Sequence, residues 1–187
     1  MSEFDNYYNY LRKRSILGYL YRKYWLYPKI CREIKGKVLD VGCGIGDMLS
    51  FRANTTGVDI NPSTVEHCRK LGLDAKLIKN DQLPFEDSSF DGVILDNVME
   101  HIENPNKILF EISRVLVADG KVIVGVPGKK GFAWDSDHKR FYDVKILKEV
   151  MSSNGFLYKK HFFMPFSCAY LDDLLRQYCL YSVFDVK

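Results

Sequence analysis

Residues 37–59 read KVLDVGCGIGDMLSFRANTTGVD, and this stretch decides the fold. The apolar run at 38–41 is typical of a buried strand, and glycines at positions 42, 44 and 46 follow it at once. Glycine adopts positive φ and has no Cβ, so a ligand can lie against the backbone where the next helix begins. A second strand ends in Asp59, and an acid at that place accepts hydrogen bonds from ribose hydroxyls in nucleotide-binding α/β folds. The stretch therefore predicts a site for an adenosine-containing cofactor.

The rest of the chain continues the alternation of strand and helix. Strand patterns lie at 38–41, 55–60, 75–79, 91–96, 121–126, 157–164 and 181–186. Helix patterns lie at 47–53, 64–71, from Asn104 onward, at 144–153 and at 169–178. We expect strand and helix to alternate five times, which favours a doubly wound α/β fold with a mostly parallel sheet of about seven strands and helices on both faces.

Length and composition favour a single catalytic-sized domain. The chain has 187 residues, of which 47% are hydrophobic, enough for one good core. Its five cysteines are odd in number and lack the short paired spacings of a zinc site, so we expect reduced thiols and a cytoplasmic location. No apolar run approaches the roughly 20 residues that span a bilayer, so no transmembrane segment is expected.

The N-terminal segment differs in composition from the rest. Between Asn6 and Lys37 it carries nine basic residues and one acidic residue, interleaved with tyrosines and Trp25. We expect one or two helices that end near Pro28, and we divide the chain into a helical extension at 1–35 and a main domain at 36–187. Two interpretations stay open. In the first, the helices pack on the main domain, and the alkyl parts of their Lys and Arg side chains lie along its surface. In the second, the helices form a lid or a surface that binds an anionic partner.

Several motifs in a fixed order carry a family resemblance. They are VLDVGCGIG at 38–46, GVDI at 57–60, LPFEDSSFD at 83–91, VMEHIENP at 98–105 and RVLVADG at 114–120. This ordered set resembles the class I S-adenosylmethionine-dependent methyltransferases, in particular the subgroup called methyltransferase type 11. The resemblance implies a Rossmann-like fold that binds S-adenosyl-L-methionine and releases S-adenosyl-L-homocysteine.

The resemblance also implies a role for each position of the glycine turn and the strand beside it. Residues 42–46 would wrap the methionine part of the cofactor, and Asp40 would organise the turn and receive the amino group. Asp59 would bind both ribose hydroxyls, and Ile60 would lie against the adenine. Cys43 is expected to be a small packing residue rather than a nucleophile.

Three further acids and amides follow in the chain. Asn80 and Asp81 compete for the adenine amino group, because the loop before Leu83 is offset from the family's usual spacing. Asp96, at the end of the fourth strand, would lie near the sulfonium and the substrate. The residues expected to contact the cofactor are Asp40, Gly42, Cys43, Gly44, Gly46, Asp59, Ile60, Asn80, Asp81 and Asp96.

The loop after the fifth strand is the expected place for the acceptor, since ligands of open α/β sheets bind beyond the carboxyl ends of the strands. We expect His138 to be a general base or substrate contact and Arg140 to clamp an anion. Alternatively, Arg140 and Asp143 tie the loop to the following helix. His101 is interpreted as a helix-start residue that shapes the edge of the pocket. Methyl transfer is an in-line displacement that needs mainly alignment, so no metal is expected.

Other functions are weighed against this one. A nicotinamide-dependent oxidoreductase is disfavoured, because its fingerprint is Gly-x-Gly-x-x-Gly whereas this chain has Gly-x-Gly-x-Gly. Nucleic acid is disfavoured as acceptor because the chain has Asp96-Asn97-Val98-Met99 where base-modifying enzymes have a Pro-Pro-aromatic motif, although the basic N-terminus keeps it open. A protein acceptor and a non-enzymatic cofactor-binding module are further alternatives. We expect transfer to an oxygen or nitrogen of a small molecule, anionic or sugar-like.

Overall fold

The computed structural model describes residues 3–13, 15–168 and 170–187, without the side chains of residues 3, 6, 7 and 10. Within these residues seven strands form one sheet in the order β3-β2-β1-β4-β5-β7-β6, and only the two pairs that include β7 are antiparallel. The predicted mostly parallel sheet is confirmed. The strands are β1 (Val38–Val41), β2 (Thr55–Asp59), β3 (Ala75–Leu77), β4 (Phe90–Asp96), β5 (Leu116–Pro127), β6 (Phe156–Met164) and β7 (Cys179–Val186).

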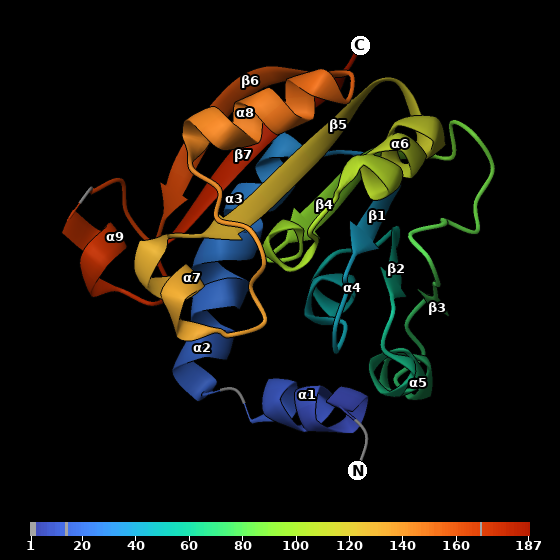
Figure 1. Cartoon of the computed structure of the whole chain (residues 1–187). Coiled ribbons are helices and arrows are strands. Elements are labelled where there is room, and N and C mark those ends of the chain that lie inside the picture. Colours follow the sequence, from blue (N-terminus) through green and yellow to red (C-terminus); the bar gives the residue numbers. More distant parts are fainter. Residues whose placement is uncertain (1–2, 14, 169) are drawn as a thin grey trace.

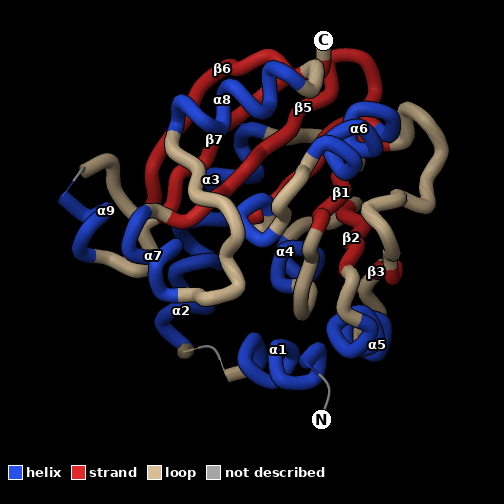
Figure 2. Tube along the Cα trace, in the orientation of Figure 1, coloured by secondary structure: helices blue, strands red, loops and turns tan. Residues whose placement is uncertain are grey.

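Helices flank the sheet on both faces, as the sequence predicts (Figures 1 and 2). They are α1 (Glu3–Arg12), α2 (Ile16–Tyr21), α3 (Tyr27–Glu33), α4 (Asp47–Phe51), α5 (Pro62–Lys70), α6 (Asn106–Val115), α7 (Lys129–Trp134), α8 (Val144–Ser153) and α9 (Tyr170–Leu174). A π-helical turn, η1 (Arg22–Leu26), and a 3-10 turn, η2 (Met99–His101), complete the described helices.

Two hydrophobic cores lie on the two faces of the sheet. The apolar stripe of α6 packs with α8 and with Leu39 and Val93 on one face. Ile30 of α3 packs with Val38 and Ile94 on the other. Neighbouring residues of β1 and of β4 thus point to opposite cores, which explains why both strands are nearly continuously apolar.

The strand order places a ligand crevice at the end of β1. From β1 the chain moves outward through β2 to β3 and then returns to β4 on the other side of β1. Ligands of open α/β sheets bind beyond the carboxyl ends of the strands where the order reverses. The glycine turn after β1 and Asp96 at the end of β4 therefore flank this crevice.

Strand and helix do not alternate between β3 and β4, because residues 78–89 form a loop without a helix, in agreement with the loop expected before Leu83 and with the absence of a helix pattern there. Arg114 of α6 holds this loop. Its guanidinium donates hydrogen bonds of 2.8 and 3.0 Å to the carbonyls of Phe85 and Leu83 and pairs with Asp87 at 2.8 Å. A side chain thus supplies the partners that a helix would have given to these backbone groups.

The expected helix end near Pro28 is wrong. The helical segment runs from Ile16 through η1 and α3 to Glu33, with Pro28 in the first turn of α3. Proline lacks an N–H and crowds the preceding turn, and the wider π-helical turn directly before it accommodates this. Of the basic residues in the predicted extension, Arg14 lies outside the described residues.

Two later boundaries differ from the sequence prediction. β5 begins at Leu116 rather than Lys121, with Asp119 at a φ of 62° inside the strand. α9 ends at Leu174 rather than Tyr178, because the Tyr178 carbonyl accepts a 2.7 Å hydrogen bond from Gly128 just before β7 begins. Ala169, the predicted first residue of that helix, lies outside the described residues. Among the described helices, none has the length and apolar character needed to cross a bilayer.

Candidate cofactor and acceptor site

The glycine turn after β1 is shaped by left-handed backbone at three positions. Gly42, Gly44 and Gly46 have φ values of 75°, 52° and 81°. The amides of Gly42 and Cys43 donate hydrogen bonds of 2.8 and 3.0 Å to the Val58 carbonyl, which ties the turn to β2. A Cβ on Gly42 would lie 2.4 Å from Cγ2 of Val98, so a larger residue is excluded by contact as well as by conformation.

Asp59 at the end of β2 connects the turn to the following helix. One carboxylate oxygen accepts a 2.8 Å hydrogen bond from the Gly44 amide, and the other accepts a 2.8 Å bond from the Asn61 amide. Burial raises the pKa of Asp59, and these amide bonds oppose that rise. A carboxylate only accepts hydrogen bonds, which is the role that the resemblance gives to Asp59 toward the ribose hydroxyls. Ile60 beside it is 60% exposed and offers an apolar surface at the crevice.

Asp40 and Asp96 bring more negative charge to the same edge of the sheet. Burial, followed by the charges of Asp96 and Asp59, raises the pKa of Asp40 well above its ordinary value. Asp96 accepts hydrogen bonds from the Tyr181 hydroxyl at 2.7 Å and from Arg22 of η1 at 3.2 Å. The raised pKa of Asp40 and the ion pair of Asp96 with Arg22 reduce the negative charge at this edge, and a cationic ligand group near the three acids would favour their ionised forms.

Cys43 packs beneath the turn. A Cβ on Gly57 would lie 2.6 Å from its sulfur, so the thiol occupies the space that the glycine of β2 leaves free. The hydrogen bond with Cys68, together with burial, raises the pKa of the Cys43 thiol. These contacts are those of a packing residue rather than of a thiolate nucleophile.

Asn80 and Asp81 form a tight turn away from Asp59. Both have positive φ, 56° and 60°, and Lys79 and Gln82 pair across them. Together with Lys107 and Phe110 of α6 they line a shallow hollow. The structure therefore turns these two residues toward α6 and does not bring either into hydrogen-bond contact with Asp59.

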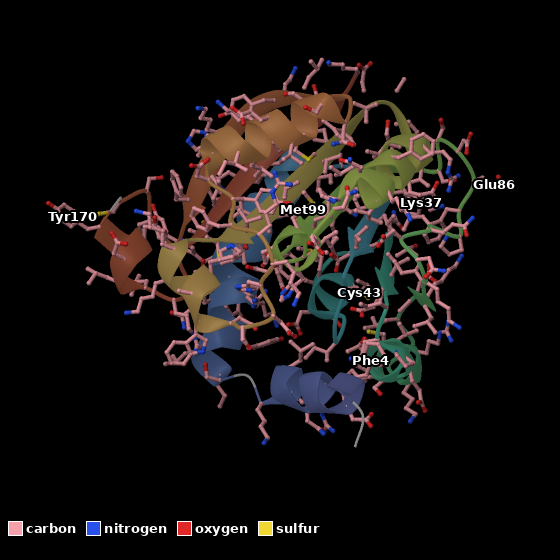
Figure 3. The ribbon with its side chains drawn as sticks, in the orientation of Figure 1. Phe4, Lys37, Cys43, Glu86, Met99 and Tyr170 are labelled. Carbon is pink, nitrogen blue, oxygen red and sulfur yellow. The ribbon has the colours of Figure 1, made fainter. Side chains whose placement is uncertain are left out.

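Helix α1 lies across the glycine turn. Leu11 is 6% exposed, and its Cδ1 is 3.3 Å from the place of a Cβ on Gly44. At the start of α5, the Asn61 side chain donates a 2.9 Å hydrogen bond to the Phe4 carbonyl, and the Ser63 hydroxyl donates a 2.9 Å bond to Asp5. In Figure 1 α1 runs below α4 and α5, and Figure 3 labels Phe4 of α1 beneath Cys43 of the turn.

The loop after β5 brings His138 to the turn that follows β4. The amides of Lys139 and Arg140 donate hydrogen bonds of 2.7 and 3.1 Å to the Glu100 carbonyl. The ring centroids of His138 and His101 are 4.7 Å apart. Burial raises the pKa of Glu100 to about 8.

Arg140 does not join this group, although it follows His138 by two residues. Its guanidinium carbon lies 5.3 Å above the ring of Tyr142, and its side chain lines a shallow hollow between the start of α6 and the end of α8. Asp143 caps α8 through a 2.7 Å hydrogen bond from the Ile146 amide. Asp143 thus ties the loop to α8, as one of the two sequence interpretations expects.

Comparison with known proteins supports the family resemblance. The methyltransferase domain family matches residues 39–124, which contain the glycine turn, Asp59 and Asp96. A solved S-adenosylmethionine-dependent methyltransferase of Thermotoga maritima has the same fold over 100% of both chains, with a TM-score of 0.76 and 17% identity. The matched region is a methyltransferase domain, and the fold is that of the solved S-adenosylmethionine-dependent methyltransferases, which supports the predicted resemblance to class I S-adenosylmethionine-dependent methyltransferases. S-adenosyl-L-methionine is the cofactor of this family, which confirms the cofactor class predicted from the motifs.

The relatives of this methyltransferase differ in their names and lengths. An uncharacterised protein of Methanocaldococcus jannaschii is 35% identical over 62% of this chain and 57% of its own length. A sterol 4-C-methyltransferase of Caenorhabditis elegans is 37% identical over 56% of this chain and 34% of its own length. Others are named as quinone and tRNA methyltransferases. The chain spans about half the length of the curated relatives it matches, so their names do not fix its acceptor.

Sequence reasoning missed three residues that the fold brings to this site. Leu11 and Arg22 come from the N-terminal helices, and no local pattern connects either one to the glycine turn or to Asp96. Glu100 was part of a family motif without a role of its own.

Proposed function

We propose that this methyltransferase transfers the methyl group of S-adenosyl-L-methionine to an oxygen or nitrogen of a small molecule. The observation that carries the proposal is the left-handed glycine turn whose Gly44 amide is held by Asp59. The acceptor atom attacks the methyl carbon, the bond from that carbon to sulfur breaks, and S-adenosyl-L-homocysteine leaves while the acceptor loses a proton. Alignment of the two reactants contributes most of the acceleration in such a displacement.

In this proposal each acid near the ends of β1, β2 and β4 contacts a different part of the cofactor. Asp40 receives the amino group, Asp59 accepts both ribose hydroxyls, and Ile60 lies against the adenine. Asp96 faces the sulfonium from the end of β4. Asn80 or Asp81 would bind the adenine amino group after turning from the hollow that they line beside α6.

The N-terminal segment is proposed to act in two parts. Residues of η1 and α3 are core, because Leu26, Tyr27 and Ile30 are buried against the sheet. Helix α1 is proposed to be a lid, because Leu11 contacts the glycine turn and the start of α5 binds the α1 backbone. The division into an extension at 1–35 and a domain at 36–187 therefore stays a proposal. Within the extension, α1 would be the lid, and η1 and α3 would be the part that packs on the domain.

The acceptor is proposed to bind between the cofactor and the loop after β5. His138 is the candidate base or acceptor contact, and Arg140 the candidate contact for an anionic or sugar-phosphate group. No described residue accepts a hydrogen bond from the Arg140 guanidinium, so its donors are free for such a group. The cytoplasmic location expected from the cysteines stays a prediction.

An RNA or protein acceptor is the second candidate, and one observation favours it. Tyr24 and Trp25 of η1 are 67% and 53% exposed, and the Lys23 ammonium lies 5.6 Å from the centre of the Tyr24 ring. Exposed aromatic rings beside basic groups bind unstacked bases. Tight RNA binding with a steep salt dependence would favour this candidate over a small molecule.

The test begins with the cofactor and then turns to the acceptor. Calorimetry should detect S-adenosyl-L-homocysteine binding and little binding of NAD. A library of small hydroxy and amino compounds is then incubated with labelled S-adenosyl-L-methionine, with RNA and total protein as competing acceptors. Absence of cofactor binding would refute the proposal and favour a partner-binding module, whereas label in RNA alone would change the acceptor class.

A further inference from the structure

Glu100 is a buried acid whose carboxyl oxygens have no hydrogen-bond partner among the described residues. It lies in η2 and is 1% exposed. A carboxyl group removed from water without a partner is costly, and such groups are normally paired or bound to a cation. Protonation or a bound cation would each stabilise this carboxyl group.

The imidazole ring of His138 faces Glu100, and a hydrogen bond holds the ring in one orientation. Its Nδ1 lies 2.9 Å from the Phe132 carbonyl oxygen. A carbonyl oxygen only accepts, so Nδ1 carries the hydrogen and, in the neutral ring, Nε2 carries a lone pair. Nε2 lies 4.0 Å from Oε1 of Glu100. At this separation the two atoms make no hydrogen bond, and a metal ion that both atoms bind would join them.

His101 completes a set of three donors. One donor atom from each of Glu100, His101 and His138 lies within 4.8 Å of the other two. Asp135 is at the rim, with Oδ2 4.0 Å from Nε2 of His138 and 43% of its side chain exposed. The backbone bonds from Lys139 and Arg140 to the Glu100 carbonyl hold the loop that carries His138 against η2, which carries Glu100 and His101. Figure 3 labels Met99, the residue before Glu100, near the middle of the molecule in that view.

We propose that Glu100, His101 and His138 bind a divalent transition-metal ion. Two imidazoles and one carboxylate suit Zn²⁺, Fe²⁺ or Co²⁺ better than Mg²⁺ or Ca²⁺. Bonds of about 2.0–2.2 Å place the ligand atoms of a tetrahedral ion roughly 3.3–3.6 Å apart. The gap between Glu100 and His138 would thus close by less than about 1 Å, which side-chain rotation supplies. The carbonyl partner of Nδ1 is the kind of outer hydrogen bond that orients a metal-binding histidine.

The ion would have a use at this place. Three protein ligands leave at least one position open for an exogenous oxygen or nitrogen. If the proposed methyl transfer is correct, the acceptor atom would bind the ion at this open position. The ion would lower the pKa of the acceptor group, so that no general base would be needed. This differs from the sequence-based expectation that no metal takes part, and it changes His138 from a base to a ligand.

Cobalt binding tests the site without methyl transfer. The full chain, stripped with a chelator, is titrated with Co²⁺ and followed by visible absorption, with Zn²⁺ as competitor. We expect one equivalent of Co²⁺, displaced by Zn²⁺. Glu100→Gln and His138→Ala should each weaken binding by at least about tenfold. His161→Ala is the matched control, because His161 lies on β6, exposed and outside the cluster.

The outcomes separate the metal site from the proposed function. Should Glu100→Gln fail to fold by circular dichroism, His101→Asn at the half-buried side of the cluster carries the same test. Wild-type protein that binds neither Co²⁺ nor Zn²⁺ below about millimolar would overturn the site and leave a shared proton between Glu100 and His138. Equal binding by the control and the cluster variants would overturn it too. S-adenosyl-L-homocysteine binding, measured separately on the metal-free wild type, reports on the proposed function alone.

Discussion

The backbone amide of Gly44 donates a 2.8 Å hydrogen bond to the carboxylate of Asp59, which lies 15 positions later in the chain. This bond closes the glycine turn of β1 onto the end of β2. The same carboxylate accepts the Asn61 amide, so one side chain fixes both the turn and the start of α5. The residue assigned to the ribose therefore also organises the loop that would hold the methionine part.

Replacing Asp59 by alanine should abolish most cofactor affinity. The change removes a charged acceptor for two ribose hydroxyls, at about 1.5–3 kcal/mol for each hydrogen bond to a charged group. We expect S-adenosyl-L-homocysteine to bind at least about 100-fold more weakly in calorimetry, since the loss of both bonds amounts to about 3 kcal/mol or more. Glu66→Ala, which removes an exposed acid from α5, is the control. Unchanged affinity in Asp59→Ala would exclude the assigned role.

Replacing Leu11 by alanine tests α1 as a lid. Leu11 is buried against Gly44, whereas Leu17 of α2 is 78% exposed and serves as the matched control. Loss of the Leu11 contact should loosen α1 and speed dissociation of S-adenosyl-L-homocysteine by about tenfold in stopped-flow displacement, equivalent to about 1.4 kcal/mol. Equal dissociation rates in the two variants would make α1 a packing element only.

Asp40 gives the fold a pH dependence with a defined sign. Its folded pKa is raised above 3.8, so the folded state keeps a proton that the unfolded chain releases. The free energy of unfolding should therefore fall as the pH rises between the two pKa values, by up to about 1.4 kcal/mol per unit. Asp40→Asn, which stays neutral, should flatten this slope in urea unfolding. Asp173→Asn on α9 should leave the slope as in the wild type, and an equal slope in Asp40→Asn would contradict the assignment.

The sequence predicts the parts of this site that are local in the chain. The strand that precedes the glycine turn, the turn itself and Asp59 all lie within 37–59, and their geometry follows from glycine conformation and strand length. Asp96 was placed correctly at the end of β4. Its partners were not, because Arg22 and Tyr181 approach it across distances of 74 and 85 residues. No local period encodes such pairings.

The remaining errors have the same cause. Pro28 indicated the end of a helix, but the packing of Ile30 and Ile34 on β1 and β4 keeps α3 helical beyond it. The loop between β3 and β4 was expected, but its anchor was not, because Arg114 satisfies the loop carbonyls from α6. In each case a tertiary contact supplies what the local pattern lacks.

The cluster of Asp96, Arg22 and Tyr181 should contribute measurably to stability. Tyr181→Phe keeps the ring stacked on Phe162 and removes the hydroxyl that donates to Asp96, so we expect a loss of about 1–2 kcal/mol in urea unfolding. Asp96→Ala leaves Arg22 without its carboxylate and should cost more, about 3 kcal/mol. Tyr170→Phe, at a residue 79% exposed, is the control and should change stability by less than about 0.5 kcal/mol. Equal stability of all three variants would remove the structural role of the cluster.

Replacing Arg140 by alanine tests whether its side chain binds the acceptor or only packs the loop after β5. If it clamps an anionic acceptor, Arg140→Ala should raise KM for that acceptor by about tenfold or more with little change in kcat, because a contact made equally in the ground and transition states is lost. Stability should fall by no more than about 1 kcal/mol, the size of an exposed contact between a cation and the Tyr142 ring. Lys139→Ala, one residue earlier and exposed, is the matched control. His138→Ala should instead lower kcat, whether the ring acts as base or as ligand. A rise in KM that Lys139→Ala reproduces would indicate a general effect of positive charge on this loop, and an unchanged KM in Arg140→Ala would leave Arg140 as a residue that packs the loop against α8.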